Sequence, residues 1–240
     1  MNDNDPPFPG GPPPAEPAGA PGPFGLPFAP GMLPPPPMPA YRVHTPRLVI
    51  RCWDPADAPL LEATVSASLE HLRPWLPWTM EEPQDLTRRV ERLRHFRGHF
   101  DLGIDFAYAV FDREEKEVLG GIGLHPRAGE GSREVGYWLG AAQAGRGIAT
   151  EAAAALTRVA FEVDRVRRVE IRCDPLNRRS WGVAERLGFT HEGTFRRHSP
   201  APDGTLRDTM VWALLADEFP ASPAARAEVE ALDAAGRHLL

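Results

Sequence analysis

Apolar residues change their spacing once along the stretch from Glu134 to Val163. Glu134–Leu139 is short and rich in β-branched and aromatic residues, which is typical of a β-strand. Gly140–Gly147 consists mostly of glycine and alanine, and such residues let another molecule come close to the backbone. Beyond this turn the apolar residues recur at helical spacing: Ala152, Ala153, Leu156, Val159, Ala160 and Val163. The pattern predicts a strand, a small-residue turn and a helix starting at Ala149.

The rest of the chain shows the same two periods. Apolar runs predict strands at 48–53, 105–111, 118–125, 168–173, 189–195 and 209–215. Helical spacing predicts helices at 55–68, 83–100 and 177–187, with Asp54 and Asn177 as N-caps and Gly188 ending the last one. We expect residues 69–78, with two prolines, to be irregular, and residues 198–207 to be a loop.

The predicted order of elements is β-α-α-β-β-β-α-β-α-β-β. Two strands joined by the polar turn 112–117 form an antiparallel hairpin, and at least one later connection is a parallel crossover. A doubly wound fold would alternate strands and helices more strictly, so it is excluded. The fold class is therefore α/β of the mixed α+β kind, around a central sheet with antiparallel and parallel pairs.

Composition divides the chain into three parts. Residues 1–40 contain 16 of the 28 prolines and neither lysine nor arginine, so we expect a disordered, proline-rich arm. This arm is either an inert tail, which we favour, or a ligand for a partner. Residues 41–220 are expected to form one folded domain. Residues 221–240 are rich in alanine and charged side chains, and we expect a loosely held helix there.

Charge and cysteine content narrow the functional class. The arm holds three acidic residues, so the net charge of −6 leaves −3 for the remainder, which argues against a dedicated nucleic-acid binder. Cys52 and Cys173 form neither a disulfide framework nor a metal-binding spacing, so no metal is expected. An export signal and a membrane-length apolar run are also lacking, and the expected location is cytoplasmic.

The turn before the predicted mid-chain helix is a candidate anion site, because unpaired backbone N–H groups meet the positive end of a helix dipole there. A plain strand-to-helix connection is the alternative. A P-loop is excluded because the single lysine, Lys116, lies in a surface turn. Gly145–Thr150 matches a dinucleotide fingerprint weakly, lacking its third glycine. The remaining option is the pyrophosphate loop of an acyl-CoA-dependent transferase.

At this point the chain resembles a known family, the GNAT superfamily of N-acetyltransferases, and within it the RimJ/RimL-type branch. The resemblance spans about residues 41–219. It is carried by Thr45-Pro46-Arg47-Leu48, residues 69–78, Gly136-Tyr137-Trp138-Leu139, residues 145–152, Asn177 with Ser180, and Leu187-Gly188-Phe189.

The resemblance implies acetyl-CoA as acyl donor and assigns roles to residues. The backbone N–H groups of Gly145, Arg146, Gly147, Ile148, Ala149 and Thr150 would hold the pyrophosphate of CoA. Main-chain groups of Trp138 and Leu139 would pair with the pantetheine arm, and a backbone N–H there would stabilise the oxyanion. Asn177 and Ser180 would face the thiol end. The wider superfamily has a tyrosine that protonates the leaving thiolate, but Ala184 stands at that position here. In the RimJ/RimL branch the serine three places after the asparagine takes this role, so Ser180 is the expected general acid.

The general base is left open by the sequence. Candidates are Glu134, His198, and either Glu70 or His71. Ribosomal-protein members should have a glutamate just after His198, but Ser199 stands there. Deprotonating an α-amine at pH 7 costs about 1 kcal/mol, against about 4.6 kcal/mol for a lysine side chain. The lack of an obvious strong base therefore favours a protein or peptide N-terminal α-amine.

The acceptor site and the partners are less constrained. Trp75 and Trp78 are candidate substrate-binding residues, in a segment that could equally be a lid over the core. One alternative acceptor is a small-molecule amine, such as an antibiotic or a polyamine. Another alternative is a non-catalytic CoA-binding or interaction module. No nucleic-acid or membrane partner is expected, and a homodimer is left open.

Overall fold

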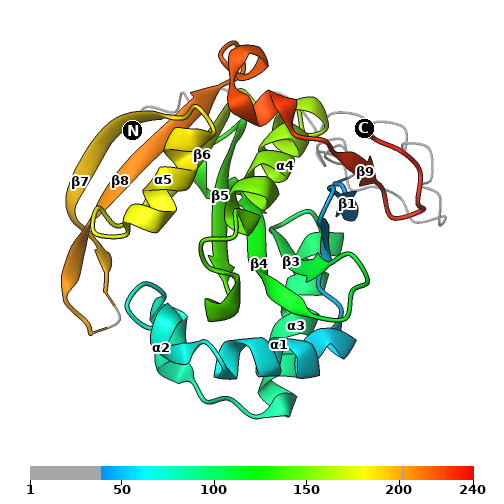
Figure 1. Ribbon diagram of the computed structural model, residues 1–240, viewed down its shortest axis with the longest axis vertical. Coiled ribbons are helices and arrows are strands. Elements are labelled where there is room, and N and C mark those ends of the chain that lie inside the picture. The colour runs from blue at the N-terminus through cyan, green and yellow to red at the C-terminus, as the bar shows by residue number, and fades with distance from the viewer. Residues whose placement is uncertain (1–38, 202) are drawn as a thin grey trace, which may run out of the picture. The chain divides into compact units, whose positions relative to one another are not determined.

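The computed structural model describes residues 39–201 and 203–240 (Figure 1). Most of the predicted arm, residues 1–40, lies outside the described residues. Its last residue already belongs to the folded domain: Ala40 is fully buried, and its carbonyl accepts a hydrogen bond of 2.9 Å from the Tyr108 hydroxyl.

The described chain contains one mixed sheet of nine strands in the order β7-β8-β6-β5-β4-β3-β2-β1-β9. Its neighbours are antiparallel except β5 and β6, which are parallel. The strands are β1 (Arg42–His44), β2 (Leu48–Cys52), β3 (Phe106–Asp112), β4 (Val118–His125), β5 (Ser132–Leu139), β6 (Arg168–Cys173), β7 (Thr190–Pro200), β8 (Leu206–Leu215) and β9 (Glu230–Leu232). The predicted mixed sheet and the order of the predicted elements are confirmed.

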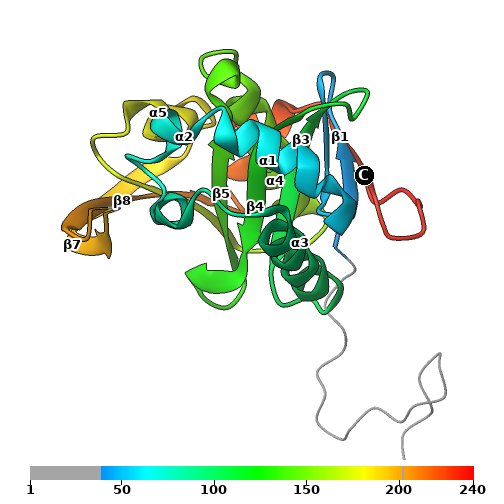
Figure 2. The same cartoon turned by 90° about the horizontal axis from the view of Figure 1, so that it is seen from below.

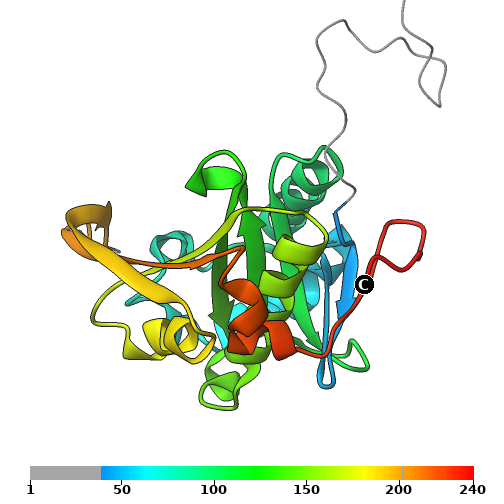
Figure 3. The same cartoon turned by 90° about the horizontal axis from the view of Figure 1, so that it is seen from above.

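Helices cover both faces of the sheet. They are α1 (Ala58–Ser66), α2 (Leu69–Leu72), α3 (Leu86–Asp101), α4 (Ile148–Glu162) and α5 (Arg178–Arg186). Figure 2 shows α1, α2 and α3 in front of the sheet, and Figure 3 shows the opposite face with α4 and α5. Successive residues of a strand point to opposite faces. On β5, Val135 therefore packs into the larger core with α4, while Trp138 packs against the smaller core with α1 and α3.

The prediction of a loosely held helix in residues 221–240 is wrong. A 3-10 turn, Pro223–Arg226, is followed by β9, which pairs antiparallel with β1. Ala231 is fully buried opposite Val43, and a turn at Gly236 (φ 75°) brings the Leu239 N–H back to the Ala231 carbonyl at 2.8 Å. The helix propensity of alanine is a weak preference, and pairing with an otherwise open sheet edge outweighs it.

Two local expectations also need correction. Both ends of the predicted loop 198–207 are strand, because Ser199 pairs with Arg207 and Pro200 with Leu206, so His198 lies in β7. A large bulge between Phe195 and Ser199 hides this pairing from the apolar pattern. The segment expected to be irregular contains the single-turn helix α2 and a 3-10 helix, Pro77–Glu81. The short strand β1 was not predicted.

Candidate active site

The predicted strand, small-residue turn and helix form one continuous segment from β5 to α4. After Leu139 comes a 3-10 turn, Ala141–Gln143, and then Gly145 and Gly147, both with φ of 78°. This left-handed conformation is strained for residues with a Cβ atom, so glycine is needed at both positions. Gly147 is also the N-cap of α4, and it supplies no side chain to the first turn.

The backbone of this loop has an unusual run of free donors. Within the described chain, the N–H groups from Gly145 to Thr150 donate to no protein acceptor, and the first helical bond joins the Glu151 N–H to the Gly147 carbonyl at 3.0 Å. Gly145, Arg146 and Gly147 are exposed to solvent. Six consecutive donors at the positive end of a helix dipole form an anion site suited to a pyrophosphate.

Three residues that the sequence pattern did not assign hold the loop in place. Glu151, in the first turn of α4, accepts hydrogen bonds from the Thr45 hydroxyl (2.6 Å) and from Arg47 Nε (2.6 Å). Arg47 Nη1 in turn donates to the Arg146 carbonyl at 3.0 Å. The Arg146 carbonyl of the loop is thereby tied to the β1–β2 turn, and the N–H groups stay available. The Thr45-Pro46-Arg47 motif was the only sequence signal for this role.

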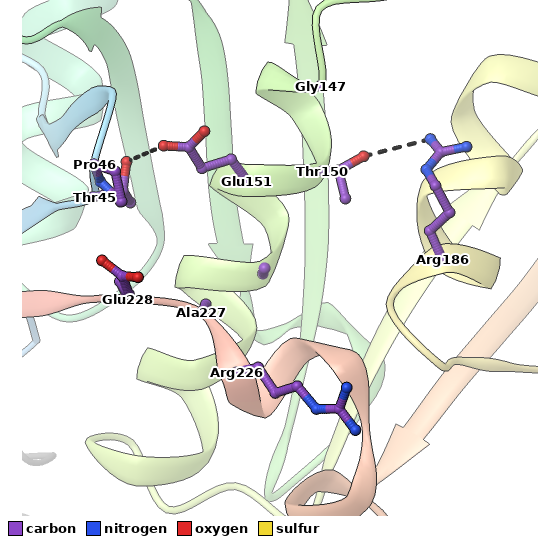
Figure 4. A pocket seen from close by; sticks show the side chains of 10 residues that line it. Thr45, Pro46, Gly147, Thr150, Glu151, Arg186, Arg226, Ala227 and Glu228 are labelled. Atoms are coloured by element: carbon purple, nitrogen blue, oxygen red, sulfur yellow. Dashed lines mark hydrogen bonds between the residues drawn. The ribbon is translucent and has the colours of Figure 1, made fainter.

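A cavity of about 460 Å³ opens beside the loop (Figure 4). Gly147 and Thr150 line one side of it, and Arg186 and Arg226 add two cationic side chains. Arg186 Nη2 lies 3.4 Å from the Thr150 hydroxyl, so its guanidinium is directed toward the first turn of α4. The free N–H groups and these two cations fit the several phosphate charges of a CoA molecule.

The sheet opens between β5 and β6 on the same side as the loop. Their parallel pairing covers only Ser132–Arg168, Arg133–Val169 and Glu134–Glu170. Beyond Glu134, β5 continues to Leu139 paired only with β4. The edge of Val135–Leu139 that faces β6 therefore offers main-chain groups to an extended ligand, as an added strand would use them. Leu139 offers its main-chain groups to this open edge, but those of Trp138 face β4, because Trp138 pairs with Gly121 in the register that the Gly140 N–H bond to the Leu119 carbonyl (2.9 Å) continues.

The N-terminus of α5 brings the predicted thiol-side residues together. The Asn177 side chain caps the helix, accepting the Ser180 N–H at 3.2 Å. Tyr137, which sequence reasoning had not assigned, donates from its hydroxyl to the Ser180 carbonyl (2.9 Å) and lies 3.2 Å from Ser180 Oγ. Burial raises the pKa of the Tyr137 phenol and raises that of the nearby Cys173 thiol to about 12. Both groups are therefore protonated at neutral pH, and Cys173 is a poor nucleophile.

The structure does not bring the two leading base candidates together. The Glu134 carboxylate is buried and accepts two hydrogen bonds from Arg127, at 2.9 and 2.6 Å. His198 is exposed on the bulge of β7, where Nδ1 lies 3.2 Å from the Ser199 hydroxyl and the ring lies 5.2 Å from that of Phe195. Glu134 pairs with Glu170 of β6, which in turn pairs with Ala213 of β8. Ser199, the neighbour of His198, pairs instead with Arg207 of β8. These rows are roughly 20 Å apart at about 3.3 Å per residue.

The remaining candidate residues lie in α2 and in the segment that follows it. Trp78 makes an edge contact with Trp138, with ring centroids 5.8 Å apart, and joins the smaller core. Trp75 is half-buried, and its carbonyl accepts a hydrogen bond of 2.9 Å from Arg207. Glu70 is exposed and His71 half-buried in α2. Trp75 and Trp78 thus stay predictions as substrate-binding residues.

Comparison with known proteins identifies the family. A sequence model of the acetyltransferase (GNAT) domain matches residues 47–190, more than half of the chain. The chain belongs to the GNAT acetyltransferase family. It is therefore an N-acetyltransferase with acetyl-CoA as acyl donor, as the sequence predicted.

Named relatives of this GNAT chain are consistent with the RimJ/RimL branch. The chain is 29% identical over 188 residues to the [ribosomal protein uS5]-alanine N-acetyltransferase of Escherichia coli K12, covering 76% of this chain and 94% of that protein. RimJ of Mycobacterium smegmatis, solved with a CoA disulfide, aligns with a TM-score of 0.67 and 26% identity over 81% of this chain and 95% of RimJ. The ribosomal-protein-S5-alanine acetyltransferase of Vibrio fischeri, at 21% identity, 74% and 98% coverage and a TM-score of 0.64, shares the fold.

Two features are absent from the described residues, 39–201 and 203–240. None of their helices is both long and apolar enough to cross a bilayer, and their His, Cys, Asp and Glu side chains form no group that could hold a metal ion. The cytoplasmic location, the homodimer and the expected lack of nucleic-acid partners stay predictions.

Proposed function

We propose that this GNAT protein acetylates the N-terminal α-amine of a protein or peptide. The observation that carries the proposal is its similarity to the uS5-alanine N-acetyltransferase over 94% of that protein's length. The state of the base candidates supports it. Glu134 is held by Arg127, and His198 is exposed on the bulge of β7, roughly 20 Å along the sheet from the row of Glu134. An acceptor that is already partly neutral at pH 7 needs the least help from a base.

The proposed arrangement uses the two ends of the open β5 edge. The free N–H groups of Gly145–Thr150, with Arg186 and Arg226 beside them, hold the phosphates. Main-chain groups of Leu139, which face the opening, align the pantetheine arm, and this brings the thioester to the place near Glu134–Glu170 where the pairing of β5 with β6 ends. Asn177 and Ser180 lie at that end on the α5 face, where Ser180 supplies a proton to the departing thiolate.

The acceptor class is tested with two peptides of one sequence. The first has a free N-terminal alanine and an acetylated lysine, and the second has an acetylated N-terminus and a free lysine. At pH 7 we expect the first to react several hundred times faster, because the reference pKa values of the two amines differ by roughly 2.6 units. CoA release and mass spectrometry measure both rates. Equal rates, or a preference for the lysine peptide or for a polyamine, would contradict the α-amine proposal.

The role of Ser180 gives a second test. We expect Ser180→Ala to lower kcat by about 10- to 100-fold, because the thiolate then leaves without a positioned proton donor. The Kd of acetyl-CoA should change less than about twofold, since the hydroxyl donates to no phosphate-binding group. Ser66→Ala, at the exposed end of α1, is the matched control. A kcat for Ser180→Ala within twofold of the wild-type value would remove Ser180 from the mechanism.

A further inference from the structure

A histidine and an aspartate that sequence reasoning did not single out form a dyad at the end of β4. His125 Nδ1 lies 2.7 Å from Asp105 Oδ1, and their side chains are 18% and 33% exposed. Burial acts to raise the pKa of Asp105, but the hydrogen bond and the charge of His125 outweigh it and lower that pKa. Asp105 is therefore a carboxylate at neutral pH and can only accept. It follows that Nδ1 carries the hydrogen of this bond, so that Nε2 holds the free lone pair whenever the imidazole is neutral.

The imidazole ring lies over two glycines, Gly123 and Gly136, on the sheet face that carries α1, α2 and α3. A Cβ atom built on Gly123 would come within 2.5 Å of His125 Nε2, and one on Gly136 within 3.4 Å of the same atom. Any side chain at Gly123 would displace the ring, so this glycine is what leaves room for it. Nε2 therefore lies next to Gly123 of β4 and close to Gly136 of β5.

Gly136 is the second residue beyond Glu134, where the pairing of β5 with β6 ends. His125 therefore stands at the start of the splay, where the proposed function puts the thioester. Ser180 meets the same opening from the other face, because it contacts Tyr137, the neighbour of Gly136 whose side chain points the opposite way. A base on one face and an acid on the other flank a single gap in the sheet.

We propose that His125 is the general base that deprotonates the acceptor amine, with Asp105 as the residue that positions its ring. This inference rests on the proposed acetyl transfer and deepens it. An imidazole, with a reference pKa of about 6.5, is matched to an α-amine near 7.7–8.0 and poorly matched to a lysine near 10.4. The dyad thereby also accounts for a preference for α-amines.

The reaction balances with these groups. Nε2 of neutral His125 takes one proton from the acceptor ammonium, and the freed nitrogen lone pair forms a bond to the thioester carbonyl carbon. The carbon–sulfur bond then breaks with its electron pair on sulfur. The thiolate receives a proton through the Ser180 hydroxyl, which is replenished by the second proton lost from the attacking nitrogen. The imidazolium releases its proton to water. The products are the amide, free CoA and one proton.

The charged groups around the ring favour His125 over Glu134. Arg127 lies beside the ring, since a Cβ on Gly136 would meet Arg127 Nη2 at 3.6 Å, and its guanidinium is engaged by both oxygens of Glu134. Arg172 Nε is a second cation 3.8 Å from Glu134. Glu134 would have to give up this pairing to accept a proton, whereas Nε2 of His125 has no hydrogen-bond partner in the described chain.

The test compares His125→Ala, His125→Gln and Asp105→Asn with wild type, using the N-terminal alanine peptide. We expect His125→Ala and His125→Gln to lower kcat by about 10²- to 10³-fold at pH 7, while the Kd of acetyl-CoA, measured by calorimetry, changes less than twofold. Added imidazole should restore part of the His125→Ala rate. Raising the pH should narrow the deficit, because the free amine then needs no base. His238→Ala, with an exposed side chain, is the matched control.

The Asp105→Asn variant shows whether Asp105 positions the His125 ring for catalysis or only stabilises the fold. We expect it to lower kcat by about tenfold and to move the acidic limb of the pH–rate profile to lower pH, because the imidazolium loses its neighbouring negative charge. A folded His125→Gln variant with kcat within twofold of wild type would overturn the assignment, as would a His125→Ala deficit that neither imidazole nor high pH reduces. Wild-type protein that fails to bind acetyl-CoA or to acetylate any amine would instead overturn the proposed function.

Discussion

Replacing Gly147 by valine is expected to abolish measurable binding of acetyl-CoA. Gly147 has φ of 78°, and a residue with a Cβ atom in this conformation is strained by roughly 1–2 kcal/mol. The new Cβ would also lie 3.4 Å from Arg47 Nη2, and the rest of the valine side chain would press on the guanidinium that holds the Arg146 carbonyl. Relief of both strains requires the loop to turn, and the N–H groups then no longer converge.

The size of this effect follows from the number of donors involved. A hydrogen bond to a charged group contributes roughly 1.5–3 kcal/mol, so losing even two of the six should weaken binding by about a hundredfold or more. Calorimetric titration with acetyl-CoA measures it. Gly236→Val is the matched control, because Gly236 also has a left-handed φ, 75°, with nothing within 4 Å of a new Cβ and no role in the site. Unchanged affinity in Gly147→Val would mean that the phosphates bind elsewhere.

Replacing Glu82 by alanine is expected to lower the free energy of unfolding by about 3–5 kcal/mol. Arg89 on α3 is almost fully buried, and its guanidinium is bound by both Glu82 oxygens, at 3.2 and 2.6 Å. Glu82 Oε2 also accepts the Gln84 N–H at 2.9 Å. Without Glu82, a guanidinium remains in the interior with neither water nor a counter-charge. Urea unfolding, followed by circular dichroism, measures the loss.

The neighbouring Glu81→Ala is the control for this prediction. Glu81 pairs with Arg92 at 3.2 Å, but its side chain is 67% exposed, so its removal should change the free energy of unfolding by less than about 1 kcal/mol. Glu82 follows the 3-10 helix that carries Trp78, so the destabilised variant should also lose order on the α2 side of the site. A change below about 1 kcal/mol for Glu82→Ala would show that water reaches Arg89.

Elements with a strong local signal were predictable from sequence alone. The helix of α4 repeats its apolar positions over four turns, and Asn177 and Gly188 mark the ends of α5 by local backbone chemistry. The phosphate loop was predictable for the same reason: its donors, its glycines and its helix are contiguous in the chain. Short strands were not predictable. Three residues each of β1 and β9 contain too little pattern, and their pairing joins segments nearly 190 positions apart.

The amino-acid sequence by itself determined the order of the main elements, the mixed sheet and the contiguous loop at Gly145–Thr150, because each depends on neighbours within a few residues. Only the tertiary structure decided which side chains meet around the opening between β5 and β6. Glu134 looked like a free carboxylate until Arg127 was found against it, and His125 looked like the end of a strand until Asp105 was found beside its ring. The proton-transfer properties of a side chain depend on the charges and hydrogen bonds that folding brings to it, and those partners come from segments outside the strand that carries it.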